Sequence, residues 1–288
     1  MISKIFQLKY VLVLCLLLVG QSILAQLKYP IVGTYQKKSA QGMAIHDNIA
    51  YLMSDGGGCR IFDLKTGKMV RYITMDSAEK DNHINNACFG KKQKGCGLMP
   101  PIYITECFGK GRCFVELIDK EGGNSKLLQT IEANENEKNM RVTVWVVDDN
   151  NDCLYAITRN GKLLLDSVGN VNNHIIKYRL PNLEEGKNVI LSEKDIIDSF
   201  DVIFANILQG CKIKGNYMYL VTGLQQSLSQ RVDAKRAIQV IDLKKKKLVK
   251  AIDLTYVTTN EPEDIDFYEG RCLLYCGQEG GIYEIKLK

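Results

Sequence analysis

The feature that most constrains the fold of this chain is an internal repeat. The segment QGMAIHDNIAYLMSDG, from Gln41, and the segment QGCKIKGNYMYLVTGL, from Gln209, share the pattern Q-G-x-x-I-x-x-N-x-x-Y-L at identical spacing. Each continues into a second similar pair, IFDLKTGKMVRYI from Ile61 and VIDLKKKKLVKAI from Val240. A repeat of this length is typical of solenoids, propellers and arrays, in which one structural unit recurs.

Each unit predicts four antiparallel strands. Apolar residues alternate at Ile45, Ile49 and Tyr51, as half-buried strands require, and Lys65–Lys68 and Lys244–Lys247 are expected at equivalent hairpin tips. Less regular units begin near residues 83, 143 and 261, which gives about 55 residues per unit. The expected fold class is all-β, a β-propeller of about five four-stranded blades. Six blades stay open if the long inserts of units two and three contain another.

Two details of the units lead to further expectations. The last unit, EPEDIDFYEGRCLLYCG followed by GGIYEIKLK, stops one strand short, while LKYPIVGTYQ at residues 27–36 is an apolar strand without a unit. Joining the two closes the ring and removes exposed sheet edges. At the end of unit three, SEKDIIDSF is expected to be partly helical, with Ser192-Glu193 as its cap. Trp145 is expected to pack between blades.

Residues 1–25 have the pattern of a secretory signal peptide. Lys4 and Lys9 precede an apolar run from Tyr10 to Gly20, and Ala25 offers a small-residue exit. The mature chain, residues 26–288, is then a single propeller domain. We expect it to be exported to the periplasm, the cell surface or the medium. No later segment is apolar enough to predict a membrane span.

The charge of the mature chain is close to balance. Removing the signal peptide lowers the formal net charge from +5 to +3, and the charges are scattered along the chain. Nucleic-acid binders concentrate Lys and Arg on one face, so no nucleic-acid partner is expected. The one basic run, Lys244–Lys247, is interpreted as a solvated hairpin tip.

Nine of the ten cysteines follow the signal peptide. Export permits disulfides, and Cys107–Cys113 is the best candidate pair because ECFGKGRC resembles a hairpin. Cys88–Cys96 is a weaker second candidate. Because nine is odd, at least one thiol stays unpaired or pairs with another chain.

The candidate site comes from the first residues of the innermost strands. When unit five is aligned to unit one by its turn, Glu263 takes the position of Gln41 and Gln209. The nearest equivalents in unit two are His83, Asn85 and Asn86, and in unit three Thr143 or Trp145. These residues are expected to form a polar ring at one solvent-filled mouth of the central channel. The predicted ligand-binding residues are Gln41, His83, Asn85, Gln209, Glu261, Glu263 and Asp264.

The ring allows more than one interpretation. Polar groups that line a channel can simply bind water and tie blades together. Carboxylate and amide oxygens around an opening also suit a hard cation such as Ca²⁺, and amides with carboxylates suit sugar hydroxyls.

The hairpins IFDLKTGKMV and VIDLKKKKLV resemble the outer strands of YVTN/SMP-30-type bacterial propellers, from about Leu27 to Lys288. SMP-30-type lactonases place a divalent metal at the channel mouth, so the resemblance implies Asn85 with Glu261 or Glu263 as ligands, and His83 or Asp264 assisting.

Enzyme motifs are otherwise absent from the sequence: it has no G-x-S-x-G, no H-E-x-x-H and no P-loop. The favoured function is a non-catalytic exported propeller that binds a glycan, a small molecule or a protein at its channel-mouth face. The alternative is a metal-dependent, lactonase-like hydrolase with its site, Glu263 and Asn85 as ligands, in the central channel.

Overall fold

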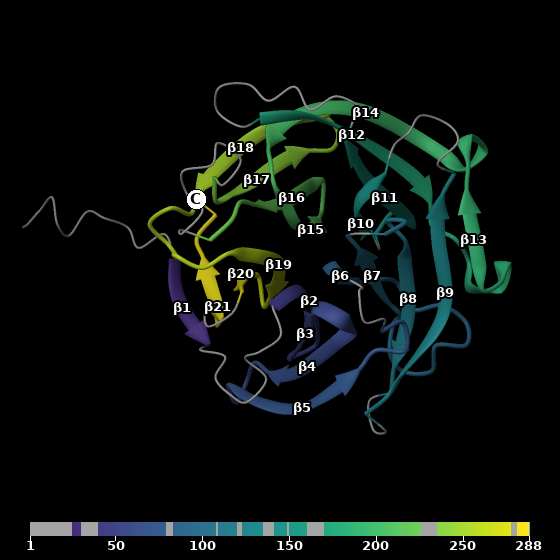
Figure 1. The fold of residues 1–288 in the computed structure, drawn as a ribbon, viewed down its shortest axis with the longest axis horizontal. Helices are drawn as coiled ribbons and strands as arrows, with labels where there is room; N and C mark the ends of the chain where they lie inside the picture. Colours follow the sequence, from purple (N-terminus) through teal and green to yellow (C-terminus); the bar gives the residue numbers. More distant parts are fainter. Residues whose placement is uncertain are drawn as a thin grey trace, which may run out of the picture.

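The computed structural model describes residues 25–29, 40–78, 83–107, 109–119, 123–134, 141–148, 150–159, 170–225, 235–277 and 281–287. Their strands form five sheets, which stand around one axis as the blades of a propeller (Figure 1). The fold class and the count of five blades are confirmed. The described residues contain no α-helix, and the short helices among them are 3₁₀ turns.

Blades one and four are the two units that show the repeat most clearly. In each, four consecutive strands pair as an antiparallel meander, with the first strand innermost. Blade one contains β2 (Ala40–His46), β3 (Ile49–Ser54), β4 (Gly58–Asp63) and β5 (Lys68–Thr74), with the 3₁₀ turn η1 (Asp55–Gly57) between β3 and β4. Blade four contains β15 (Leu208–Lys214), β16 (Tyr217–Thr222), β17 (Ala237–Asp242) and β18 (Lys247–Asp253).

Blades two and three follow the same plan with longer connections. Blade two contains β6 (Ile84–Phe89), β7 (Ile102–Glu106), β8 (Cys113–Ile118) and β9 (Ser125–Ala133). Blade three contains β10 (Val142–Asp148), β11 (Cys153–Arg159), β12 (Asn170–Arg179) and β14 (Ile196–Ala205).

Blade five joins the two ends of the described chain. It contains β19 (Pro262–Tyr268), β20 (Arg271–Cys276), β21 (Gly281–Ile285) and β1 (Ala25–Tyr29). Strand β1 pairs antiparallel with β21, with Leu27 opposite Tyr283, so the N-terminal strand completes the last blade as predicted (Figure 1). Residues 30–36 of the predicted strand lie outside the described residues. Each blade therefore contributes one strand to the centre of the ring.

The end of unit three departs from the prediction. The last segment of the unit divides into β13 (Asn188–Leu191), the 3₁₀ turn η4 (Glu193–Asp195) and β14. Only β14 belongs to blade three, because β13 pairs in parallel with β9 and becomes a fifth strand of blade two. The expected helical character is limited to η4, where the Ser192 backbone N–H donates to Asp195 over 2.9 Å.

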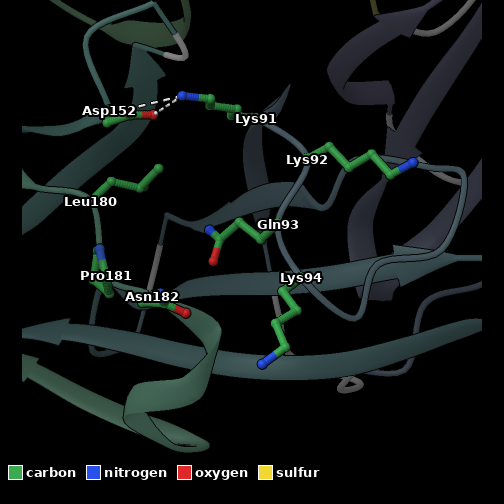
Figure 2. A pocket seen from close by; sticks show the side chains of 8 residues that line it. All are labelled: Lys91, Lys92, Gln93, Lys94, Asp152, Leu180, Pro181 and Asn182. Atoms are coloured by element: carbon green, nitrogen blue, oxygen red, sulfur yellow. Dashed lines mark hydrogen bonds and ion pairs between the residues drawn. The ribbon is translucent and has the colours of Figure 1, made fainter.

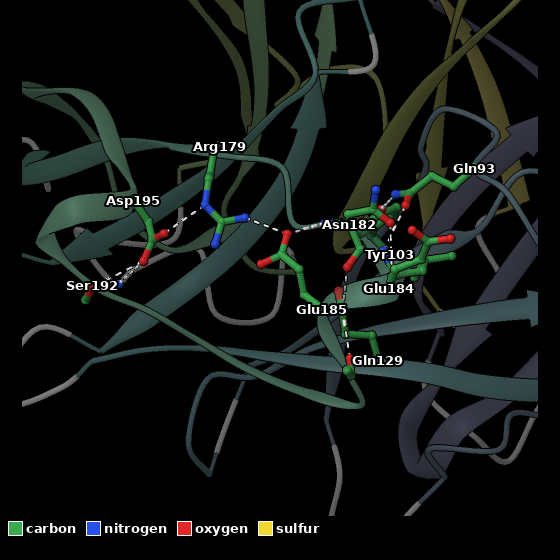
Figure 3. Close-up of polar contacts among 11 residues, drawn as sticks. Gln93, Tyr103, Gln129, Arg179, Asn182, Glu184, Glu185, Ser192 and Asp195 are labelled. Atoms are coloured by element: carbon green, nitrogen blue, oxygen red, sulfur yellow. Dashed lines mark hydrogen bonds and ion pairs between the residues drawn. The ribbon is translucent and has the colours of Figure 1, made fainter.

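Residues 180–195, which we name the strap, fasten blade three to blade two (Figure 3). They include the 3₁₀ turn η3 (Leu183–Glu185) as well as β13 and η4. The Gln129 amide of blade two donates to two strap carbonyls, 3.1 Å from Asn182 and 2.9 Å from Gly186. Arg179 pairs with strap carboxylates at both ends of its guanidinium, 2.7 Å from Glu185 and 2.8 Å from Asp195. An insert within one repeat thus fixes the angle between two blades.

The apolar core lies between neighbouring blades. The largest of its clusters surrounds Trp145, which is fully buried and donates its indole N–H to the Gly111 carbonyl over 2.7 Å. Packing between blades, predicted for this tryptophan, is confirmed. No helix among the described residues is long and apolar enough to span a bilayer.

The cysteines differ from the prediction. The nine described cysteines form no disulfide, so the expected Cys107–Cys113 and Cys88–Cys96 bridges are both wrong. Cys88, Cys96 and Cys113 are buried, and Cys107 alone of the nine is partly exposed. Burial raises the pKa of the Cys88 thiol to about 12, so these side chains act as small apolar groups in the core.

Candidate functional site

A β-bulge interrupts the start of every innermost strand. The pairing register shifts between Ala40 and Met43, Ile84 and Asn86, Val142 and Val144, Leu208 and Cys211, and Pro262 and Asp264. The residues within these shifts are Gln41-Gly42, Asn85, Thr143, Gln209-Gly210 and Glu263. The alignment of Glu263 with Gln41 and Gln209 is confirmed, and Thr143, not Trp145, is the equivalent in unit three. Because a bulge re-aims the extra side chain, each blade presents one such residue near the axis.

Asp264, which directly follows the bulge of β19, ties three blades together at the axis. Its Oδ2 accepts the backbone N–H of Met43 from blade one (2.7 Å) and of Ala87 from blade two (3.2 Å). Its Oδ1 accepts the N–H of Ile265 on its own strand, over 2.8 Å. The side chain is fully buried. Its contacts are therefore architectural: a single carboxyl group satisfies backbone donors from three inner strands.

Asn86 has the complementary role on the other side of the axis. Its Nδ2 donates to the Trp145 carbonyl of blade three over 2.8 Å, and its Oδ1 accepts the Cys211 N–H of blade four over 2.7 Å. It is also fully buried. Asp264 and Asn86 together connect all five inner strands by hydrogen bonds.

We name Asp264 and Asn86 the polar plug. Its packing explains why a glycine follows the glutamine in the Q-G repeat. A Cβ at Gly210 would lie 2.1 Å from Asp264 Oδ1 and 2.6 Å from the Glu263 carbonyl. A Cβ at Gly42 would lie 2.8 Å from the Ala87 nitrogen. Gly210 thus makes room for the Asp264 side chain of blade five, and Gly42 for the backbone of blade two.

Below the plug, a buried ion pair closes the axis. Asp266 accepts the Ile45 N–H over 2.8 Å and pairs with the Lys212 ammonium over 3.0 Å. The prediction of a solvent-filled mouth is therefore wrong for the ring itself. Gln41, Asn85, Gln209 and Glu263 are buried, with between 1% and 6% of their surface exposed.

Two polar pairs connect the ring region with the surface, where Glu261, His83 and Asp55 are partly exposed. Gln209 donates its amide nitrogen to Glu261 Oε1 over 2.6 Å and to the Gly223 carbonyl over 2.9 Å. His83 Nδ1 lies 2.7 Å from Asp55 Oδ1, and both side chains are partly exposed. His83 and Glu261 are therefore more exposed than the four ring residues.

Glu263 differs from Asp264, Asn86 and Asp266 in its hydrogen bonding. It is 4% exposed, and no described residue makes a hydrogen bond to its carboxyl group. Two glycines pack closely against this residue. A Cβ at Gly210 would lie 2.6 Å from its backbone carbonyl oxygen, and a Cβ at Gly277 would lie 2.4 Å from its Oε1. Burying a carboxyl group without a partner is costly, so its presence here points to a role beyond packing.

Burial and neighbouring charge shift the carboxyl groups of this region. Desolvation raises the pKa of Glu263 well above its usual value, and Glu261, Asp55 and Asp264 raise it further. Desolvation also raises the pKa of Glu261, against the opposing effects of the Gln209 hydrogen bond and of His83. For Asp264, burial raises the pKa, while the backbone donors oppose the shift. A carboxylic acid kept protonated near neutral pH can donate a hydrogen bond or a proton.

Sequence reasoning missed the contributions of Asp55 and Asp266. Asp55 lies in η1, between the second and third strands of its blade. Its contact with His83 at the mouth forms only in the folded chain. Asp266 continues the alternation that begins with Asp264, which is a signal that the sequence contained.

The described residues include no group of three or more His, Cys, Asp and Glu side chains placed to hold a metal ion. Asn85, one of the two predicted ligands, lies in the ring with its Nδ2 3.4 Å from the Thr143 carbonyl. Glu263 and Asn85 are thus both at the ring, without a third acidic or imidazole ligand among the described side chains.

A hollow of about 280 Å³ lies between blades two and three, at the ends of the inner strands that are opposite to the mouth (Figure 2). Three lysines line it, but Lys91 pairs with Asp152 over 3.1 Å and Lys94 pairs with Glu184 over 3.0 Å. The Gln93 side chain accepts a hydrogen bond from the Leu183 backbone N–H and donates one to the Tyr103 hydroxyl group. Most of these contacts join blade two to the strap or to the β10–β11 turn of blade three, so we assign this hollow to the blade interface.

Comparison with known proteins supports the fold. No family model and no curated protein sequence matches the chain, so the resemblance to YVTN/SMP-30-type propellers is not confirmed. Among solved structures, the crystal structure of Myxococcus xanthus glutaminyl cyclase is similar, with a TM-score of 0.55 and 13% sequence identity over 91% of this chain and 95% of that one. At this identity the likeness shows that the two share a propeller fold.

Proposed function

We propose that this protein is exported and binds a small polar ligand through the channel-mouth face, at Glu263 and the residues around it. Export rests on the signal-peptide pattern of residues 1–25. Of the ligand classes that the sequence allows, a small molecule or a short glycan fits best, because the polar groups gather around one axis and not along an extended surface.

The observation that carries this proposal is the contrast between Glu263 and its neighbours. Asp264, Asn86 and Asp266 all accept or donate hydrogen bonds that hold blades together. Glu263 stands one residue away from Asp264 and has no such bond from a described residue. A buried group whose pKa is strongly shifted, and whose polar neighbours are all hydrogen-bonded, is a candidate for a functional site.

One observation favours a second candidate, an enzyme that transfers protons. The His83–Asp55 pair, at 2.7 Å, is near Glu261, and Asp55 and Glu261 both shift the pKa of Glu263. An imidazole oriented by a carboxylate beside a protonated carboxyl group is an arrangement suited to general acid–base catalysis. The structural neighbour is an enzyme by its name, glutaminyl cyclase, which adds weight to this candidate at the level of the fold alone.

The test is a ligand screen on the mature chain and on two variants. Thermal unfolding would be followed with single sugars, disaccharides, amino acids, small amines, Ca²⁺ and Zn²⁺ as probes. A ligand of the mouth should stabilise the parent protein and lose most of its effect in Glu263→Gln. The control is Glu269→Gln, because Glu269 is an exposed partner of Arg271 at the far end of β19. Ligands whose effect is equal in all three proteins would refute the site.

A further inference from the structure

This inference rests on the proposed function and specifies the ligand. We infer that the group bound at Glu263 is an organic ammonium, so that the ligand is a small molecule carrying a primary amine. Three features of the mouth lead to this conclusion: the acidic neighbours of Glu263, the kind of hydrogen-bonding atoms around it, and the lack of a hydrogen bond to its carboxyl group from any described residue.

The groups whose charge shifts the pKa of Glu263 are carboxyl groups: Glu261, Asp55 and Asp264. His83 pairs with Asp55 over 2.7 Å and is close enough to Glu261 to lower the pKa of that carboxyl group. The buried guanidinium of Arg60 on β4 lies 3.4 Å from the Tyr275 hydroxyl group. A cationic ligand would therefore gain Coulomb energy at this position, whereas an anionic ligand would be repelled.

The hydrogen-bonding atoms at the mouth are mostly acceptors. Gln209 uses its amide nitrogen for both of its hydrogen bonds, to Glu261 and to Gly223, which leaves its carbonyl oxygen as an acceptor. The carboxyl groups of Glu261 and Glu263 add further acceptor oxygens. An ammonium group supplies three N–H donors from one atom, so it can satisfy several of these oxygens at once.

A hydroxyl group or a metal ion matches the same site less well. A sugar hydroxyl supplies one donor and no charge, and it leaves the repulsion between the carboxyl groups in place. Ca²⁺ takes six to eight oxygen ligands, and the described residues offer no group of three acidic or imidazole side chains placed for a metal.

Binding of the ammonium should release a proton. Burial favours the neutral form of Glu263, and so do its neighbours Glu261, Asp55 and Asp264. When the ammonium arrives, the ionised carboxylate becomes the favoured form. The carboxyl O–H bond then breaks, the proton passes to solvent, and the carboxylate accepts an N–H from the ligand. The ligand keeps all its protons, so one proton is released for each ligand bound.

The experiment compares ligands that differ only in an amine. Glucosamine against glucose, and benzylammonium against benzyl alcohol, would be titrated calorimetrically into the mature protein near pH 7. Charge-assisted hydrogen bonds to a buried partner predict that the amine of each pair binds about tenfold to a hundredfold more tightly. Repeating the titration in buffers of different ionisation enthalpy should show about one proton released per amine.

Variants decide which group is responsible. Glu263→Gln should abolish the preference for the amine and the proton release, whereas Glu269→Gln should leave both unchanged. If Glu263→Gln does not fold, Glu261→Gln serves in its place and should reduce the same preference.

The outcomes separate the inference from the proposed function. Tighter binding of glucose or benzyl alcohol, or of Ca²⁺, with loss of binding in Glu263→Gln, would overturn the inference and leave the proposed site standing. Binding of an amine that is unaffected by Glu263→Gln would refute both. Failure of both amines to bind at millimolar concentration would also overturn the inference.

Discussion

The plug at the propeller axis leads to a sharp prediction for the substitution Asp264→Asn. The change keeps the volume of the side chain but replaces one acceptor oxygen by an NH₂ group. In the native protein Oδ2 faces the N–H groups of Met43 and Ala87, and Oδ1 faces that of Ile265. Whichever way the amide turns, at least one backbone donor meets another donor.

The expected cost follows from the burial of these groups. A buried donor that loses its acceptor costs about 1–3 kcal/mol, and the bonds that remain lose any assistance from the carboxylate charge. If the amide oxygen keeps Met43 and Ala87, we expect a loss of about 1–3 kcal/mol from Ile265 alone. If it turns the other way, two donors are orphaned and the loss is about 2–6 kcal/mol.

Urea unfolding followed by fluorescence measures this loss. The chain has one tryptophan, and Trp145 is fully buried in the largest core cluster, so its emission reports unfolding of the ring. With an m value of about 2–3 kcal/mol/M, the smaller loss moves the midpoint by about 0.3–1.5 M. The matched control is Asp201→Asn, because Asp201 is an exposed partner of His174 on an outer strand, and its midpoint should move by about 0.3 M or less.

The reasoning would be refuted if Asp264→Asn unfolded at the same urea concentration as the parent protein. An equal shift in Asp201→Asn would also count against it, because the loss would then reflect the removal of negative charge in general and not the donors at the axis.

Three further predictions concern the same region. Gly210→Ala should lower the melting temperature by far more than Gly215→Ala, because the new Cβ would meet the Asp264 carboxyl group, whereas a Cβ at Gly215 meets open space and costs about 1 kcal/mol for its positive φ; similar shifts would contradict the plug. The folded protein holds a proton on Glu263 that the unfolded chain releases above a pH of about 4, so this group makes stability fall as pH rises from there. The melting temperature of Glu263→Gln relative to the parent should therefore increase from pH 5 to pH 8, and a difference that is constant with pH would disprove the shift. Thiol labelling of the mature native protein should modify Cys107 rapidly and the buried cysteines only on unfolding, and fewer than nine reactive thiols in denaturant would reveal a disulfide.

The sequence determined the architecture to a large extent. Two copies of Q-G-x-x-I-x-x-N-x-x-Y-L defined the inner hairpin of a blade, and the incomplete last unit indicated closure by an N-terminal strand. The alignment that grouped Gln41, Gln209 and Glu263 also predicted the bulge position of their strands. These features are visible in one dimension because alternation, turns and repeats are local properties of the chain.

Other features depended on which side chains meet at the axis. The sequence did not show that Asp264 and Asn86 would fill the centre and leave the ring buried, because each bonds to the backbones of strands more than 50 residues away. Nor did it show that β13 would join the neighbouring blade, because the residues of a strand do not indicate which sheet the strand will extend.

The repeat thus determined how many blades form and which residue of each lies nearest the axis. Only the tertiary structure decided whether the side chain of that residue contacts water, bonds to a neighbouring backbone or has no hydrogen bond from a described residue. The physical reason is that hydrogen bonding and solvation at the axis depend on five strands at once, whereas the pattern of a single strand records its own alternation alone.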